Sequence, residues 1–399
     1  MRMTKEELVK LIEEKQEKGF LSKEDYYEIG LAHRELPKQE RNWSWLLSLT
    51  GGFKSSESYR TFVVHRLRDS NTLDVAHDKE FVAQKQELFK ATQRLRDERT
   101  SINRTLREEA RLERFIQTIQ DVAKEYRKLP AVICAKVDMN RPTSEAVYGL
   151  ADLHLGPIIE NYINTYDYNE AVERINKVAE DIIYYCKLNN VSKLHFINLG
   201  DLIAGIIHPT IRLEQEYDVI EQVLKASELV TELLNVLQQA APEVTYRSVV
   251  DNHARVMPDK NQHIELENLN RIIDVFVEER LKDTNIKFMK DNVDIGIGRI
   301  ELRSGKKLYF MHGHQDRKSS VVQDIVGLTH EFPDYILMGH YHNSAEHTFQ
   351  GAKLFITSSI IGTDTYAFGK RLFGQPEQKL LIFDARNNVV DVDIRCKVK

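Results

Sequence analysis

Residues 146–156 read AVYGLADLHLG, a short apolar run that ends in Asp152 and His154. An apolar run of this length is typical of a buried strand. Four later apolar runs are also followed at once by polar residues of the kinds that bind metal ions. They are LHFINLG (194–200) before Asp201, VTYRSVV (244–250) before Asn252 and His253, KLYFM (307–311) before His312, and YILMG (335–339) before His340 and His342.

The segments between the first three runs have the periodicity of amphipathic helices, over about 168–188 and 217–239. Alternation of strands and helices indicates an α/β domain, which we place at residues 145–399. In such folds, ligands bind beyond the carboxyl ends of the strands. We therefore expect the five polar strand ends to meet at one site.

The side chains at these strand ends offer carboxylate, imidazole and amide oxygen donors, and no cysteine joins them. Such donors suit manganese first, and also iron, zinc, nickel or magnesium. A polar group at a buried strand end costs a few kcal/mol unless it is paired, and a cation would pair all of them at once. Two divalent ions about 3.5–4 Å apart need a bridging carboxylate, for which Asp201 is the candidate.

Five strings of the sequence resemble, in order, the motifs of the calcineurin-like metallophosphoesterase superfamily. The resemblance covers roughly residues 145–399 and implies a two-sheet β-sandwich flanked by helices. The tail SSIIGTDTYAFGKRLFGQPEQKLLIFD is similar to phage-encoded members. The five strings are ADLHLG (151–156), NLGDLIAG (198–205), VVDNHAR (249–255), FMHGHQ (310–315) and MGHYH (338–342).

The resemblance also implies a role for each matched position. His253 would lie beside the scissile phosphate, as a proton donor or transition-state stabiliser, and metal-bound hydroxide would attack without a covalent intermediate. The metal ligands would be Asp152, His154 and His342 for the first ion, Asn252, His312 and His340 for the second, and Asp201 for both.

Three further residues near these motifs come from our own interpretation of the sequence. Arg255 is a candidate phosphate clamp, with a surface arginine as the alternative. His314 is expected to support the ligands rather than to bind a metal ion. His208, in the loop after Asp201, is a candidate contact to the substrate.

Two positions depart from the family pattern. The usual glycine before Asn-His is Asp251 here, a position that we expect to need an unusual backbone angle. A second aspartate often follows the bridging one by three residues and orients the catalytic histidine, but Ala204, followed by Gly205, stands there. Its absence removes no metal ligand, but it bears on the protonation and the efficiency of His253.

The chain before residue 145 is expected to be all helical, with a helical region at 1–72. Within it, residues 41–68 contain an apolar helix, a Gly51-Gly52 turn and a second helix, which is the helix-turn-helix outline. This segment carries five basic residues and one acid, so DNA is a candidate partner. A helical packing module is the alternative.

Residues 73–130 are expected to form a long helical connector. Residues 80–128 contain no glycine or proline, and Phe81, Leu88, Leu95 and Ile102 recur every seven residues. The alternate heptad positions are polar, so the pattern is not a perfect zipper. A coiled-coil homo-oligomer and a helical hairpin against the N-terminal helices both remain possible.

Composition excludes several classes of protein. Hydrophobic residues make up 42% of the chain and charged residues 29%, which argues against a disordered chain. The sequence has no apolar run of about 18 residues, no apolar signal region and no Cys-x-x-Cys, so we expect a cytoplasmic protein of phage or bacterial type without a membrane partner. Residues 1–150 carry 28 basic and 25 acidic residues and the rest 28 and 36, which allows an anionic partner for the first part and cations for the second.

These observations lead to three hypotheses about function. The first is a dinuclear metal-dependent phosphoesterase, with a phosphodiesterase or nuclease acting on DNA as the preferred form. The second is a small-molecule phosphatase or cyclic-nucleotide phosphodiesterase. The third is a non-catalytic DNA-binding scaffold with a structural metal.

Overall fold

The computed structural model describes residues 3–75, 79–207 and 215–396, which divide into two compact units, 1–108 and 109–399. The first unit is helical, as expected. Its helices are α1 (Lys5–Gln16), α2 (Lys23–Glu35), α3 (Trp43–Thr50), α4 (Ser56–Val75) and the first part of α5 (Lys79–Glu125).

Local sequence signals set the helix ends of this unit. Thr4 and Ser22 each form a capping box at the start of α1 and α2, which satisfies backbone N–H groups that have no partner inside a helix. Helix α3 ends at Gly51, whose φ of 64° is a conformation that glycine adopts without strain. The core of the unit consists of buried side chains from all four of its first helices: Leu8, Ile12, Ile29, Ala32, Leu36, Leu46, Tyr59 and Val63.

The second unit contains the expected two sheets. The six-stranded sheet has the order β13-β12-β1-β4-β5-β6, and the five-stranded sheet has the order β10-β11-β9-β8-β7. The strands of the first sheet are β1 (Ser144–Leu150), β4 (Val191–Asn198), β5 (Glu243–Ser248), β6 (Ile286–Phe288), β12 (Glu377–Phe383) and β13 (Val389–Arg395). Those of the second are β7 (Ile297–Glu301), β8 (Lys307–Met311), β9 (Tyr335–Met338), β10 (Ala345–Phe349) and β11 (Ala352–Ile356), and β2 (Ile159–Glu160) pairs with β3 (Thr165–Tyr166).

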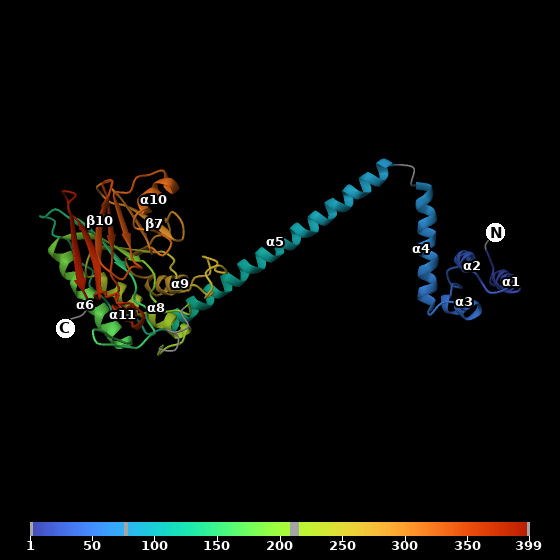
Figure 1. The fold of residues 1–399 in the computed structure, drawn as a ribbon, viewed down its shortest axis with the longest axis horizontal. Helices are drawn as coiled ribbons and strands as arrows, with labels where there is room; N and C mark the ends of the chain where they lie inside the picture. The colour runs from blue at the N-terminus through green and yellow to red at the C-terminus, as the bar shows by residue number, and fades with distance from the viewer. Residues whose placement is uncertain (1–2, 76–78, 208–214, 397–399) are drawn as a thin grey trace. The chain divides into compact units, whose positions relative to one another are not determined.

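The two sheets pack face to face and helices cover their outer faces (Figure 1). Side chains such as Ile197, Phe310 and Leu337 fill the space between the sheets. Since both faces of β1 are covered, all seven of its residues are buried, which explains its continuous apolar pattern. The helices of this unit are α6 (Tyr168–Leu188), α8 (Val219–Leu237) and α9 (Asn270–Leu281) on the first sheet, α10 (Val321–Thr329) on the second, and the short α11 (Thr365–Lys370).

The strand directions bring the motif residues together. Strands β1, β4 and β5 are mutually parallel in the first sheet, and β8 and β9 are parallel in the second. Their carboxyl ends therefore lie along a common edge of each sheet. The backbone N–H groups of Asp152 and His154 donate to the carbonyls of Gly200 and Asp201, which ties the first two motif loops to each other.

Candidate metal centre

The structure brings the seven predicted ligand residues into one cluster. His154 Nε2 lies 3.2 Å from His342 Nε2, and His312 Nε2 lies 3.1 Å from Asp201 Oδ2 and 3.0 Å from Asn252 Oδ1. Three sets have ligand atoms that all lie within 4.8 Å of one another: Asp152, His154 and His342; Asp201, His312 and His340; and His154, Asp201 and His253. The first two sets match the two predicted sites.

Asp201 occupies the position expected of a bridging ligand. Its Oδ2 atom lies 3.8 Å from His154 Nε2 on one side and 3.1 Å from His312 Nε2 on the other. Its Oδ1 atom accepts a hydrogen bond from the backbone N–H of His253 at 3.1 Å. One oxygen is therefore held by the protein while the other faces ligands of both predicted ions.

The charges and donors of the cluster fit cations. Asp152 is fully buried, and its Oδ1 atom has no hydrogen-bond partner among the described residues, which is costly unless a cation lies beside it. Burial alone would raise the pKa of Asp201, but the positive charges of His312 and His253 hold it well below its usual range. Burial lowers the pKa of His312, yet Asp201 raises it overall. Burial would also raise the pKa of Asp152, but the charge of His342 lowers it overall, so both acids are ionised at neutral pH. No cysteine is among the described residues of the cluster, as in a site for hard or borderline divalent ions.

The backbone at the cluster is strained. Five of the seven predicted ligands have φ between 46° and 67°, a left-handed conformation that non-glycine residues seldom adopt. Such strain persists where the surrounding structure enforces it, and it gathers at functional sites. The five residues are Asp152, His154, Asp201, His340 and His342.

Backbone carbonyl groups fix the ring orientation of two histidines. His312 Nδ1 lies 2.8 Å from the Leu199 carbonyl, and His253 Nδ1 lies 2.9 Å from the Ala204 carbonyl. A carbonyl only accepts, so Nδ1 carries the proton in both rings. At His253, the carbonyl of Ala204 therefore orients the ring. This is the role that the resemblance gives to the aspartate that is missing at position 204.

The expectation of an unusual backbone angle at Asp251 is wrong. Its backbone is not in the left-handed region; Gly200, at φ 96°, is, and a Cβ there would lie 2.4 Å from the Asp251 Cβ. The extra side chain at position 251 thus occupies space that Gly200 leaves free. Burial, and then the charge of Asp201, raise the pKa of Asp251 to about 8, so this carboxyl is largely protonated at neutral pH.

The remaining candidates lie in other surroundings. The Arg255 guanidinium donates to the carbonyls of Met257 (3.1 Å) and Pro258 (2.7 Å) in its own loop. The His314 ring lies 5.4 Å from the ring of His312, and burial and that neighbour lower its pKa to about 3. His208 lies outside the described residues.

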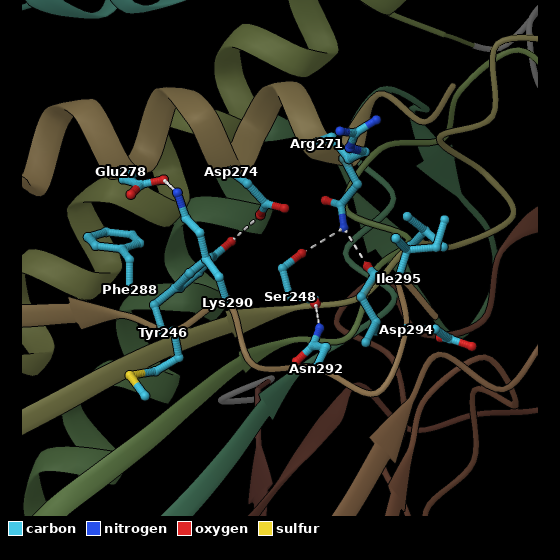
Figure 2. Close-up of a pocket in the computed structure, with 14 residues that line it drawn as sticks. Tyr246, Ser248, Arg271, Asp274, Glu278, Phe288, Lys290, Asn292, Asp294 and Ile295 are labelled. Carbon is cyan, nitrogen blue, oxygen red and sulfur yellow. Dashed lines mark hydrogen bonds and ion pairs between the residues drawn. The ribbon is translucent and has the colours of Figure 1, made fainter. Parts of the chain in front are cut away.

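A buried polar network behind the cluster was not predicted from the sequence. Figure 2 shows the part of it that lines a cavity of about 460 Å³ between α9 and the loop after β6, including Tyr246 and Asp274. Tyr246 Oη donates to Asp274 (2.6 Å), while Asn198 donates to Asn270 (2.9 Å) and accepts from the backbone N–H of Gly200 (3.0 Å). Within this network, Asn198 holds the backbone of Gly200, the residue before Asp201.

A larger cavity of about 930 Å³ opens in front of the cluster. His154, His253, His340 and His342 line its inner end. Much of one wall comes from residues 361–374, which are far from the motifs in the sequence and had not been predicted as part of the site. That segment is fixed to the metal cluster, because the N–H groups of Ile360 and Ile361 both donate to the Asp152 carbonyl.

Searches against known proteins found distant similarities. No family model matches the chain. The SPbeta prophage-derived protein YonJ of Bacillus subtilis (strain 168) is 24% identical over 304 residues, covering 72% of this chain and 73% of YonJ.

Among solved structures, an archaeal phosphodiesterase is 11% identical with a TM-score of 0.30, covering 62% of this chain and 99% of its own. Vps29 from Entamoeba histolytica complexed with zinc is 14% identical with a TM-score of 0.29, covering 63% and 99%. The protein PH1004 of Pyrococcus horikoshii OT3 is 11% identical with a TM-score of 0.34, covering 64% and 89%.

Within the described residues, no helix has the length and apolar character that a membrane span requires.

Two packed sheets with helices on both outer faces form the second unit. Five motifs, in the expected order, meet at the carboxyl ends of its parallel strands. The second unit therefore has the two-sheet architecture flanked by helices that the resemblance implied, with the motif residues gathered at one site.

Proposed function

We propose that this chain is a metal-dependent phosphoric ester hydrolase that cleaves phosphodiesters, with DNA as the preferred substrate. The observation that carries the proposal is the convergence of six predicted ligands in overlapping groups of three, each with its ligand atoms within 4.8 Å of one another. The six are Asp152, His154, Asp201, His312, His340 and His342. When bound, two divalent ions would supply Lewis acidity and lower the pKa of a water molecule. Manganese is the first candidate among the metals that suit these donors.

The protein side of the reaction rests on His253. Its Nδ1 proton is held by the Ala204 carbonyl, and its Nε2 atom lies 3.9 Å from Asp201 Oδ2, on the side of the metal ligands. A proton at Nε2 can pass to the leaving oxygen of a bound ester. Arg255 remains a candidate phosphate clamp, provided that its side chain leaves the carbonyls of Met257 and Pro258 when substrate binds.

The first test compares two model substrates. We expect the manganese-loaded chain to hydrolyse bis(p-nitrophenyl) phosphate faster than p-nitrophenyl phosphate, and we expect EDTA to stop both reactions. Hydrolysis of the monoester alone would refute the diesterase and favour a small-molecule phosphatase. No hydrolysis of either ester by a metal-loaded chain would favour the non-catalytic scaffold.

Delivery of DNA by the first unit is the second part of the proposal. Helix α3, the turn at residues 51–55 and α4 follow one another as the helix-turn-helix outline requires. Lys54 and Arg60 are exposed at the turn and at the start of α4, where base and phosphate contacts would fall. Each phosphate contact contributes about −0.9 to the slope of log K against log salt.

We expect Lys54→Gln and Arg60→Gln each to weaken duplex DNA binding by the full chain and to make this slope less negative by about one. Fluorescence anisotropy with EDTA present, at several salt concentrations, measures both quantities. Lys18→Gln, at another exposed lysine of the first unit, is the matched control. Equal affinities for all four proteins would refute DNA binding by this surface and favour the packing-module interpretation.

The exposed side of α5 supports self-association as an alternative role for the connector. Leu88, Leu95 and Ile102 recur every seven residues and remain 69%, 66% and 52% exposed within the chain. A coiled coil would bury them. Sedimentation velocity of the full chain distinguishes a dimer from a monomer.

A further inference from the structure

The cavity in front of the predicted metal ligands has an unusual charge for a phosphate ester site. Among the described residues that line it, none is lysine or arginine, and one, Asp364, is acidic. Apart from the cluster histidines and Asp364, its described walls are apolar or neutral, with Pro157, Ile159 and Ile361 among the apolar side chains. Apart from the predicted metal ligands and His253, the described walls therefore offer no positive charge to a substrate.

The position of Asp364 is fixed by contacts on both sides. Asp364 Oδ1 accepts a hydrogen bond from the backbone N–H of Ala367 at 2.6 Å and caps α11. The preceding residue, Thr363, exchanges hydrogen bonds with the backbone of Gly374 at 3.0 and 3.1 Å. The carboxylate is therefore held at the cavity wall.

Two buried side chains hold the backbone of residues 360–363, where this wall begins. The buried Arg174 side chain donates to the carbonyls of Ile360 (2.7 Å) and Ile361 (3.0 Å), and Asn164 donates to those of Ile361 (2.8 Å) and Thr363 (3.1 Å). A substitution that keeps the cap at position 364 should therefore change the charge of the wall and leave its shape intact.

Asp364 also acts electrostatically on the cluster. Burial lowers the pKa of His342, while Asp152, then Asp201 and Asp364, raise it. Of these three acids, Asp364 is the only one that is not a predicted metal ligand. Its negative charge thus remains uncompensated by a coordinated ion.

We propose that Asp364 selects phosphodiesters over phosphomonoesters by repelling a second phosphate charge, and that the apolar wall receives the uncharged ester group. A phosphodiester carries one negative charge, whereas a monoester is largely a dianion above pH 6. The inference rests on the proposed hydrolase function and specifies its substrate class. For charges about 12 Å apart at an effective dielectric constant of about 20, Coulomb's law gives a factor of about ten for each phosphate charge.

The experiment uses two esters with the same leaving group, methyl p-nitrophenyl phosphate and p-nitrophenyl phosphate, at pH 8 with manganese. Asp364→Asn keeps a capping oxygen and removes the charge. We expect it to raise kcat/KM for both anions, and to raise it for the doubly charged monoester about tenfold more than for the diester. Asp364→Glu keeps the charge and should retain the selectivity of the natural protein.

Two further measurements distinguish an effect of the Asp364 charge from a change in the structure of the cavity wall. Isothermal titration calorimetry of the metal-loaded proteins should show inorganic phosphate, largely a dianion at pH 8, binding at least tenfold more tightly to Asp364→Asn. The difference should shrink in 1 M salt, where charges are screened over about 3 Å.

Unchanged selectivity and phosphate affinity in Asp364→Asn, with the diester hydrolysed by the natural protein, would overturn this inference alone. A metal-loaded natural protein that hydrolyses neither ester would overturn the proposed function, and this inference with it.

Discussion

Replacing His253 with glutamine is expected to lower kcat for a phosphodiester by about 10²–10⁴-fold, the usual contribution of a general acid, while metal content stays the same. The ring is positioned by the Ala204 carbonyl and presents Nε2 to the metal cluster. Glutamine can still donate to that carbonyl, but it cannot transfer a proton at neutral pH. Steady-state kinetics and elemental analysis of the same preparation measure both quantities.

The matched control is His347→Gln, at an exposed histidine of β10. It should leave kcat and metal content unchanged. A substrate with a better leaving group, which needs less protonation, should show a smaller loss for His253→Gln. A variant at position 253 that keeps full kcat with both metals bound would refute the assigned role.

The strand ends of this fold could be predicted because their signal is local. Each apolar run, such as AVYGLA before Asp152, stops where the strand leaves the core, and a ligand-type residue follows at once. Parallel strands have their carboxyl ends on the same side, so five such ends suffice to predict one site. The helices at 168–188 and about 217–239 were likewise visible in the amphipathic pattern and are confirmed as α6 and α8.

The features of the site that could not be predicted from the sequence depend on contacts between distant segments of the chain. The left-handed backbone of Asp152 and His340 follows from the turns that bring the ligands together, not from residue type. The expectation for Asp251 was wrong because its steric partner, Gly200, lies 51 positions earlier and carries the unusual angle itself. The cavity wall near Asp364 joins the site through the carbonyl of Asp152, about 200 residues away.

Loss of Asp201, the predicted bridging carboxylate, should have the broadest effect of any single substitution at this site. Asp201→Asn is isosteric and neutral, and Asp201 Oδ2 faces ligands of both predicted ions. We expect bound metal to fall from two ions per chain to fewer than one, and hydrolysis to fall below detection. Elemental analysis after gel filtration measures the first quantity directly.

Thermal unfolding gives an independent measure of the same loss. Metal at a hundred times its Kd stabilises the natural protein by about 2.7 kcal/mol per site, and this gain should disappear in Asp201→Asn. Asp201→Asn also loses its attraction to protonated His312, which lowers stability above the usual carboxyl pKa even without metal. The quantity to compare is therefore the change in Tm on adding manganese to each protein, not the Tm itself.

Asp274→Asn is the control that separates metal binding from burial of a carboxyl group. Asp274 is held by Tyr246 in the cavity behind the cluster, and burial raises its pKa to about 6. Its replacement removes a buried acid without removing a predicted ligand, so the increase in Tm on adding manganese should persist. If Asp201→Asn kept two ions and the full increase in Tm, Asp201 would not bridge them, and a dinuclear centre built on this carboxylate would be excluded.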